Sequence, residues 1–387
     1  MIRELCKSRE DWMEKLESVG VTYHSSGLPP VGEQKGGLWW DETVRWHLSS
    51  EEVDRLDDAT AELHALCMST VDHIIRREPG LLVTLFGFKE WMADYVCRSW
   101  LRADPSLMGR MDLAYDPETL AVKLLEYNAD TPTLAIETAL VQWQWLQDTM
   151  PDADQFNSLH EALLSAFQGL APRIAGRRMH FSAFKDFPEE WAHLTYYRDL
   201  AQQASITTSG MDIAAVRWNG QSFLDDLGMP VQFLHMLYPW EWIEADEFGP
   251  HLAKDTLGKI EPPWKAVVSH KAFLTILWRL HPGHPNLLEA MMGSAPAQGH
   301  WAEKPALGRE GGNVRLMEDG VVTAETTGTY GDGVRVSQAF APMLSQDGWT
   351  TVIGSWVADG RPAGIIFRES ATAVVADVSR VVPHFFT

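Results

Sequence analysis

The chain has 387 residues, of which 45% are hydrophobic and 22% charged, so it is long enough to bury a sizeable core in two or three packed subdomains. A formal net charge of -21 argues against a general affinity for nucleic acid or for an anionic membrane surface. Three cysteines without metal-ligand spacing predict neither a disulfide framework nor a zinc site, and the lack of a signal-peptide core or of a run of about 20 apolar residues predicts a cytoplasmic protein.

The N-terminal part of the chain is predicted to be mainly helical. Helical periodicity covers residues 9–18 and residues 49–77, and Ser49 with Glu52 has the spacing of a capping box at the start of the longer segment. The apolar segment 85–101 is expected to form a third helix. We expect these helices to act as scaffold.

A β-hairpin is predicted within residues 109–133, the stretch around which the other motifs are arranged. Two runs with strand character flank the turn sequence Asp-Pro-Glu-Thr. Asp112, Glu126 and Asn128 alternate with apolar neighbours, so pairing of the two strands brings their oxygen atoms together. Such oxygens suit Mg²⁺, and the Arg110 guanidinium nearby suits a phosphate or carboxylate oxygen. On this stretch alone, a solvated hairpin face is the more frequent explanation.

A polar loop, Asn-Ala-Asp-Thr-Pro-Thr at residues 128–133, follows the second strand. We expect a helix to begin near Pro132 and to run to about Met150, which places the loop at a helix N-terminus. Backbone amides and the positive end of the helix dipole favour an anionic group there.

The middle of the chain is predicted to alternate between helices and short strands. A helix is expected at residues 157–169, and strands are expected at residues 179–184, 212–218 and 231–237. A loss of periodicity in residues 250–264 indicates a soft subdomain boundary.

Two adjacent acids, Glu189 and Glu190, begin a predicted helix that continues to Gln203. Acidic residues are usual in the first turn of a helix, because they complement its dipole. The functional alternative is a carboxylate pair that faces a cationic amine.

An unusual aromatic sequence, Tyr-Pro-Trp-Glu-Trp, follows at residues 238–242.

Residues 264–280 are predicted to form one apolar helix, with Lys271 towards its start. The helix is expected to end at the sequence His281-Pro282-Gly283-His284. A helix-ending turn is favoured there over a metal site, because a zinc site needs further ligands.

A glycine-rich loop follows the predicted strand that ends in Lys304. Gly308, Gly311 and Gly312 let backbone amides approach the oxygens of a triphosphate, and Lys304 supplies positive charge. The loop is not a Walker A motif, because a strand rather than a helix follows it. On this stretch alone, a glycine-rich hairpin is the more frequent explanation.

The last part of the chain is predicted to be a meander of strands at residues 334–340, 350–357 and 362–367. Gln338 precedes a connection whose backbone groups could bind an adenine ring. Arg368 closes the last strand, and it is one of the few basic residues from which a phosphate site could be built in so acidic a chain.

Several motifs occur in order from about residue 80 to the C-terminus: Arg-Met-Asp (110–112), Glu-Tyr-Asn-Ala-Asp-Thr-Pro-Thr (126–133), Pro-Glu-Glu (188–190), Tyr-Pro-Trp-Glu-Trp (238–242), Ser-His-Lys-Ala (269–272), Lys-Pro-Ala-Leu-Gly-Arg-Glu-Gly (304–311) and Gly-Ile-Ile-Phe-Arg-Glu-Ser (364–370). Together they resemble the synthetase domain of the glutathionylspermidine synthase family, which has an ATP-grasp-type fold. The resemblance implies ATP-dependent amide formation, in which a carboxylate is activated as an acyl phosphate and an amine then displaces phosphate.

The resemblance also implies roles for individual residues. Mg²⁺ would be held by Asp112, Glu126 and Asn128. ATP would be bound by Lys271, Lys304, Gly308, Arg309, Gly311 and Gln338. Arg110 and Arg368 would be catalytic, by stabilising the transferred phosphoryl group. The substrates would be contacted by Asp130, Thr131, Thr133, Glu189 and Glu190.

The chain departs from the family pattern at three places. The loop carries Thr131 and Thr133 where family members commonly have Ser, and the residues before Tyr238 lack the Lys often found there. The residues after Glu369 also differ. These departures leave open which acceptor substrate is used, and Cys6, Cys67 and Cys97 show no hydrolase motif, so we expect a synthetase without the reverse amidase.

The leading hypothesis is an α+β protein of ATP-grasp type that joins a peptide or amino-acid carboxylate to an amine, either a polyamine or an amino acid. A nucleotide-binding regulatory protein without turnover is the hypothesis from another class. We expect a helical segment at residues 1–105, a preATP-grasp and substrate-binding region at 106–255, and a nucleotide-binding region at 256–387. The expected partners are small-molecule carboxylates and amines, with neither nucleic acid nor membrane.

Overall fold

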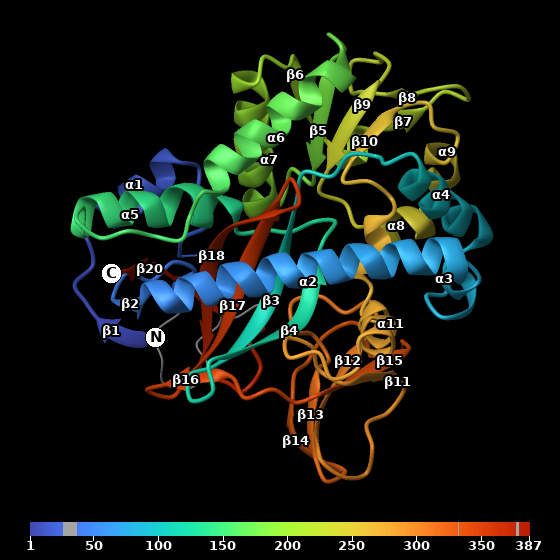
Figure 1. Ribbon diagram of the computed structural model, residues 1–387. Coiled ribbons are helices and arrows are strands. Elements are labelled where there is room, and N and C mark those ends of the chain that lie inside the picture. Colours follow the sequence, from blue (N-terminus) through green and yellow to red (C-terminus); the bar gives the residue numbers. More distant parts are fainter. Residues whose placement is uncertain (26–36, 332, 377–378) are drawn as a thin grey trace.

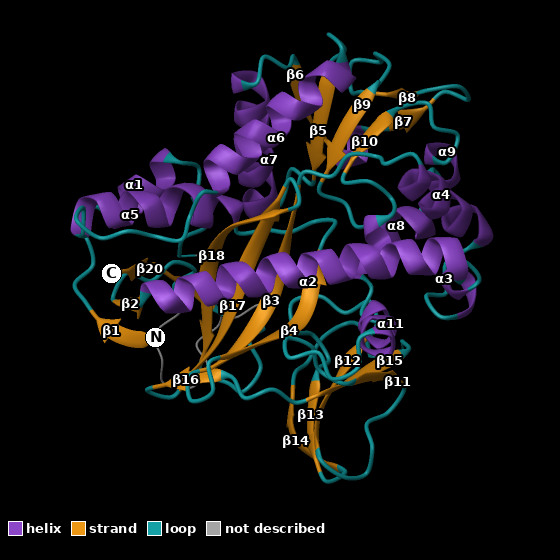
Figure 2. Ribbon diagram, in the orientation of Figure 1, coloured by secondary structure: helices purple, strands orange, loops and turns teal. Residues whose placement is uncertain are grey.

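A computed structural model of the chain describes residues 1–25, 37–331, 333–376 and 379–387. Helices and strands are interleaved along these residues, so the fold is mixed α/β (Figures 1 and 2). Three larger sheets carry most of the described strands, and two smaller sheets carry the others.

The largest sheet has six antiparallel strands and contains the predicted hairpin. Its order is β19-β18-β17-β3-β4, and β16 pairs with β17 at one end. The strands are β3 (Met108–Asp116), β4 (Ala121–Asn128), β16 (Leu344–Gln346), β17 (Trp349–Ala358), β18 (Arg361–Ser370) and β19 (Arg380–Val382). The hairpin prediction is confirmed, since β3 and β4 pair in antiparallel register across their turn.

A second sheet has five antiparallel strands in the order β11-β15-β12-β13-β14. The strands are β11 (Ala290–Met292), β12 (His300–Pro305), β13 (Arg315–Glu318), β14 (Val321–Glu325) and β15 (Arg335–Ala339). The predicted glycine-rich loop therefore lies between two strands, as expected. The predicted C-terminal meander is wrong, because β15 pairs with β12 here, whereas β17 and β18 form a hairpin in the largest sheet.

A third sheet has four parallel strands in the order β10-β9-β5-β6. Helices connect β5 to β6 and β9 to β10, as neighbouring parallel strands require, whereas the connection from β6 to β9 contains only a short 3-10 turn and two short strands. The strands are β5 (Met179–Ala183), β6 (Thr208–Asp212), β9 (Phe233–Met236) and β10 (Gly258–Ile260); the helices before and after β5 are α6 (Leu159–Ile174) and α7 (Pro188–Gln203). These positions confirm the predicted elements at 157–169, 179–184 and 231–237.

The strand expected at residues 212–218 is misplaced. β6 ends at Asp212, whose side chain accepts a hydrogen bond from the Ala214 amide and caps a short 3-10 turn, η2 (Ile213–Ala215). Aspartate often makes such a bond in place of a strand ladder. The chain then forms a small two-stranded sheet from β7 (Arg217–Trp218) and β8 (Phe223–Leu224).

The longest helix, α2 (Ser50–Arg77), lies across one face of the largest sheet (Figure 1). The predicted capping box is confirmed, because Ser49 and Glu52 exchange side-chain-to-backbone hydrogen bonds. The opposite face is covered by α6 and by the π-helical turn η1 (Glu137–Val141). Ile365 and Ile366 of β18 accordingly belong to different hydrophobic clusters, as alternation along a strand requires.

Two helices that were expected to be continuous are interrupted. The segment 85–101 becomes helical only at Glu90, since Gly87 adopts a left-handed φ of 74°. The segment 264–280 divides at His270, whose backbone is extended and whose Nδ1 accepts a hydrogen bond from the Ala272 amide. The remaining helices are α1 (Trp12–Ser18), α3 (Leu81–Thr84), α4 (Glu90–Leu101), α5 (Gln142–Thr149), α8 (Trp240–Ala245), α9 (Gly249–Leu252), α10 (Lys265–Ser269) and α11 (Phe273–Leu280).

The two ends of the chain meet in one small sheet, in which β2 (Val44–Leu48) pairs with both β1 (Ile2–Leu5) and β20 (His384–Phe386). These N-terminal strands were not expected in a segment predicted to be helical. Beside this sheet Glu369 is fully buried, and it accepts hydrogen bonds of 2.9 Å from each of Arg3, Trp46 and Arg380.

The division into three regions stays a prediction. Strands from different predicted regions pair with one another, β3 with β17 and β9 with β10. Among the described helices, none combines the length and the apolar character needed to span a bilayer.

Candidate active site

The register of β3 and β4 brings four predicted site residues onto one face of the hairpin. Arg110 lies opposite Asn128, and Asp112 lies opposite Glu126, with a bulge directly after Asp112. Because side chains alternate along a strand, Glu126 and Asn128 point to the same side. The predicted convergence of the oxygen-bearing side chains is therefore confirmed.

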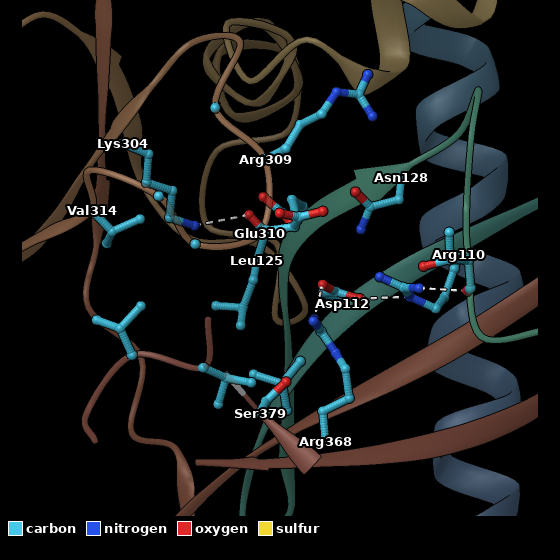
Figure 3. A pocket seen from close by; sticks show the side chains of 18 of the residues that line it. Arg110, Asp112, Leu125, Asn128, Lys304, Arg309, Glu310, Val314, Arg368 and Ser379 are labelled. Atoms are coloured by element: carbon cyan, nitrogen blue, oxygen red, sulfur yellow. Dashed lines mark hydrogen bonds and ion pairs between the residues drawn. The ribbon is translucent and has the colours of Figure 1, made fainter. Parts of the chain in front are cut away.

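This face forms part of the wall of a cavity of about 940 Å³. The cavity lies between the hairpin and the glycine-rich loop (Figure 3), and residues at the N-terminus of α7 also line it. It brings together nearly all of the predicted site residues: Arg110, Asp112, Glu126, Asn128, Thr131, Thr133, Glu189, Glu190, Lys271, Lys304, Gly308, Arg309, Gly311, Gln338 and Arg368.

Asp130 is the exception, since it lies outside the lining of this cavity. Its side chain is buried, and its carboxylate accepts hydrogen bonds from the Ser269 hydroxyl at 2.9 Å and from the Trp240 amide at 3.3 Å. Asp130 thus fixes the loop that carries Thr131 and Thr133, and its contact with a substrate stays a prediction.

Asp112 is held between two arginines, as Figure 3 shows. Arg110 Nε lies 3.0 Å from Oδ1, and Arg368 Nη2 lies 2.5 Å from Oδ2. Arg110 also donates to the Thr133 carbonyl at 2.7 Å, which ties the hairpin to the following loop. The Arg368 Nε group is buried and has no hydrogen-bond partner among the described residues, so it remains able to donate to an oxygen in the cavity.

Two lysines surround Glu126. Lys271 Nζ lies 3.0 Å from Glu126 Oε2, while Lys304 Nζ donates to Gln338 Oε1 at 2.7 Å and to the Leu125 carbonyl at 3.1 Å. Burial alone would raise the pKa of Glu126, but Lys271, Lys304 and Arg368 outweigh it and hold the pKa well below its usual range. Burial lowers the pKa of Lys304 to about 8.

The walls beyond Lys304 are mainly apolar. The sequence analysis did not predict these apolar residues as part of the site, although it predicted strands for most of the segments in which they lie. The apolar residues are Ala302, Val314, Leu316, Ala339, Phe340, Ala341, Met343 and Val352. Gln338 is anchored beside them, because its Nε2 donates to the Leu124 carbonyl at 2.9 Å.

The glycine-rich loop is tied to both ends of the cavity. Lys271 Nζ donates to the Gly308 carbonyl. Gly311 adopts a φ of 66°, and a Cβ at this position would lie only 2.9 Å from the Val375 carbonyl oxygen. Arg309 extends away from Lys304 (Figure 3). Its guanidinium donates to Glu241 at 2.8 Å and to the Thr131 hydroxyl at 2.9 Å, so it anchors the loop to its surroundings.

The end of the cavity formed by Thr131, Thr133, Glu189 and Glu190 is called the substrate end below. Burial raises the pKa of Glu190, which accepts a hydrogen bond from the Phe184 amide at 3.3 Å. Sequence reasoning missed the aromatic residues there, which are Tyr23, Trp39, Phe184, Phe187 and Trp242. The unusual aromatic sequence at residues 238–242 could have indicated that Trp242 lies in the site. No sequence pattern indicated Tyr23 or Trp39.

The family model described as glutathionylspermidine synthase preATP-grasp matches residues 3–387. A Haemophilus influenzae protein provisionally named an acid–amine ligase is 35% identical, and the match covers 98% of each chain.

Two larger proteins also match. Trypanothione synthetase of Crithidia fasciculata is 26% identical over 81% of this chain, and the bifunctional glutathionylspermidine synthetase/amidase of Escherichia coli is 25% identical over 87% of this chain. The chain spans only 52% and 58% of the lengths of these two relatives.

Proposed function

The chain belongs to the glutathionylspermidine synthase family, and from this we propose that it is an ATP-dependent ligase that joins a carboxylate to an amine. The observation that carries the proposal is the convergence of two carboxylates, an amide and four cations in one cavity of about 940 Å³. The cations are Arg110, Lys271, Lys304 and Arg368. The proposed fold type is ATP-grasp, with the nucleotide against the apolar walls beyond Lys304.

The oxygen donors of the hairpin fit a magnesium ion. Asp112, Glu126 and Asn128 offer two carboxylates and one amide on a single strand face, which are hard ligands suited to this metal. Asn128 would bind through its Oδ1, because the amide nitrogen is a hydrogen-bond donor and cannot ligate a cation. When bound, Mg²⁺ would neutralise and orient phosphate oxygens.

In the proposed first step, the substrate carboxylate attacks the γ-phosphorus of ATP. The bond from that phosphorus to the bridging oxygen breaks, and ADP leaves with the electron pair. Phosphoryl transfer mainly requires positioning and stabilisation of spread negative charge. Lys271 and Lys304 would hold the phosphates, and the unpartnered Nε of Arg368 would donate to the transferred group.

In the proposed second step, a neutral amine attacks the carbonyl carbon of the acyl phosphate and expels inorganic phosphate. The incoming ammonium must first lose a proton. Glu190 is a candidate to accept it, because its carboxyl group lines the cavity and burial raises its pKa. Thr131 and Thr133 would bind the carboxylate substrate through their hydroxyls and the adjoining amides.

The test is phosphate release from ATP and Mg²⁺ by the purified protein, across a panel of carboxylates each paired with amines. A productive pair yields ADP and a condensed product whose mass is lowered by one water. Asp112→Asn and Glu126→Gln should each abolish this turnover in a folded protein. Nucleotide binding without turnover across the panel, unchanged in these variants, would instead favour a binding-only protein.

A further inference from the structure

A second cavity, of about 310 Å³, lies at the N-terminal edge of the four-stranded parallel sheet, where β9 and β10 begin. Four basic residues line it, namely Arg102, Arg173, Arg177 and Lys259, and it is called the basic cavity below. None of its described lining residues also lines the candidate active site. Its volume is at the lower end of the range of small-molecule sites, which begins at about 300 Å³.

Two acidic residues also line the basic cavity, but both are already paired. Arg102 lies 2.8 Å from Asp104 and 2.7 Å from Asp255, measured from nitrogen to carboxylate oxygen, and Lys259 Nζ lies 3.2 Å from Asp255. Arg98 contacts Asp255 from outside the cavity lining. Burial alone would raise the pKa of Asp255, but the hydrogen bond from Arg102 and the charge of Lys259 outweigh it and lower the pKa to about 2. These acids therefore do not form a cation site.

The other two basic residues have no acidic partner among the described residues. Arg173 Nη1 donates to the Ala103 carbonyl at 3.2 Å. Arg177 donates through Nε to the Ile174 carbonyl at 2.8 Å and through Nη2 to the Arg173 carbonyl at 2.5 Å. Both side chains are exposed, and a guanidinium carries several N–H groups, so each keeps donors for a ligand. Two like charges this close repel each other, and an anion bound between them would relieve the repulsion.

Helix capping alone does not explain this arrangement. Arg177 binds carbonyls at the end of α6, which is a usual role for a basic residue there. Arg173, however, reaches across to Ala103, in the segment after α4 that also carries Arg102, and Lys259 comes from β10. Basic side chains from three segments thus line one cavity in a chain whose net charge is -21. In so acidic a chain, a local excess of positive charge favours a bound anion.

The basic cavity offers little apolar surface to a ligand. Phe233 and Leu257 line it, but each is only 5% exposed. Gln232 and Thr256 are exposed beside them and supply a side-chain amide and a hydroxyl. A ligand would therefore meet mainly guanidinium, amide and hydroxyl groups. These groups suit the oxygens of a compact phosphate or carboxylate compound better than an aromatic or hydrocarbon body.

We propose that the basic cavity is a second ligand site, which binds a compact anion with at least two negative charges on phosphate or carboxylate groups. Arg173 and Arg177 bind the anion through their free N–H groups, and Gln232 and Thr256 complete its hydrogen bonds. The inference goes beyond the proposed function, because neither ATP nor the substrates of the ligase reaction are assigned to this cavity.

The test is a calorimetric titration of the intact protein with pyrophosphate, citrate and acetate in the presence of a chelator. Arg173→Gln and Arg177→Gln are the test variants, because both side chains are exposed and each substitution removes one guanidinium from the cavity. Arg178→Gln is the matched control, since Arg178 is exposed, follows Arg177 directly and lies outside the cavity lining. Lys271→Met is the control for anion binding in the active site.

Pyrophosphate or citrate is expected to bind with a dissociation constant below about 1 mM, and acetate at least about tenfold more weakly. The tighter of the first two identifies the preferred anionic group. Each test variant should weaken that binding by about tenfold, as the loss of charge-assisted hydrogen bonds implies. Arg178→Gln and Lys271→Met should leave it within about twofold, because salt screens charges outside the cavity.

Three results would overturn the proposal. The first is that neither pyrophosphate nor citrate binds. The second is that Arg178→Gln weakens binding as much as the test variants do. The third is that Lys271→Met abolishes binding while both test variants keep it, which would place the anion in the active site. Failure of the non-hydrolysable nucleotide AMP-PCP to bind would contradict the ligase function and leave the second ligand site standing.

Discussion

Lys271 and Glu126 form an ion pair inside the candidate active site, with 3.0 Å between Nζ and Oε2. Asp112 is bound in the same way by Arg110 and Arg368. Three of the four cations in the proposed phosphate site, Lys271, Arg110 and Arg368, are therefore paired with the carboxylates proposed to bind Mg²⁺. If Mg²⁺ bound alone, the basic side chains would lose their carboxylate partners, and if nucleotide bound alone, the carboxylates would lose their basic partners. Either case leaves a buried charge without a partner, which is costly. When Mg²⁺ and nucleotide bind together, the carboxylates bind the metal and the basic residues bind phosphate, so no charge is left unpaired.

The first prediction is strong coupling between Mg²⁺ and nucleotide. AMP-PCP should bind at least about tenfold more tightly with Mg²⁺ than with a chelator, within the usual range of coupling free energies. Lys271→Met should weaken nucleotide binding but strengthen the binding of Mn²⁺ alone, because it frees Glu126. Calorimetry and the electron paramagnetic resonance of free Mn²⁺ measure these two effects. Unchanged Mn²⁺ affinity in Lys271→Met would contradict the partner exchange.

The second prediction concerns pH. Burial lowers the pKa of Lys304 to about 8, with Lys271 reinforcing the shift and Glu126 opposing it. Below this pH the ammonium is charged and attracts phosphate, and bound nucleotide raises its pKa, so affinity is lost as the pH rises through 8. The dissociation constant of Mg-AMP-PCP should increase by up to about tenfold per pH unit above 8. Lys304→Arg stays charged and provides the control, and a wild-type profile as flat as that of the variant would contradict the assignment.

The third prediction concerns Glu137, the buried carboxylate that accepts hydrogen bonds from Tyr23 and Trp39. Glu137→Gln keeps an oxygen acceptor for Tyr23 and Trp39 and removes the buried charge, so its free energy of unfolding should stay within about 1 kcal/mol of the wild type. Glu137→Ala leaves both donors unsatisfied and should lose about 2–3 kcal/mol. Urea denaturation measures both variants. Equal stability of the two would show that the hydrogen bonds to Glu137 contribute little.

The fourth prediction concerns the glycine-rich loop. Gly311 has a φ of 66°, which is unfavourable for alanine. In Gly311→Ala the new Cβ would also lie 2.9 Å from the Val375 carbonyl oxygen, so the loop must shift. Nucleotide affinity should fall by about tenfold if that loop contacts phosphate. Gly169→Ala is the matched control, because Gly169 lies within α6 with no neighbour inside 4 Å and should become slightly more stable. Calorimetry with AMP-PCP compares the two, and an unchanged affinity in Gly311→Ala would remove the loop from the phosphate site.

The convergence at the hairpin could be predicted because it depends on local rules. A turn sequence and a two-residue alternation are enough to set Asp112 opposite Glu126. Most of the other motif residues could be gathered only through the family resemblance, since the cavity joins segments that are far apart in the sequence. The division of the helix at His270 could not be predicted, because it depends on one side-chain hydrogen bond to the Ala272 amide.

The substrate end was the least predictable part of the site. Tyr23 and Trp39 are positioned there by hydrogen bonds to Glu137, which is about a hundred residues away in the sequence. A contact over such a separation produces no periodic pattern from which it could be predicted. Asp130 was expected to face a substrate because of its place in a motif, yet it binds Ser269 and the Trp240 amide. Motif membership indicates that a residue matters to a site, but it does not separate the residues that contact a ligand from those that hold the loop.

The burial of Glu369 has a consequence for how the protein is made. Glu369 follows Arg368 directly and binds Arg3, near the start of the chain, and Arg380, near its end. The chain is synthesised from its N-terminus, and Glu369 is made 366 residues after Arg3. The Arg3–Glu369 contact can therefore form only late in synthesis. A chain that stops before Arg368 therefore lacks part of the candidate active site, which is completed only late in synthesis.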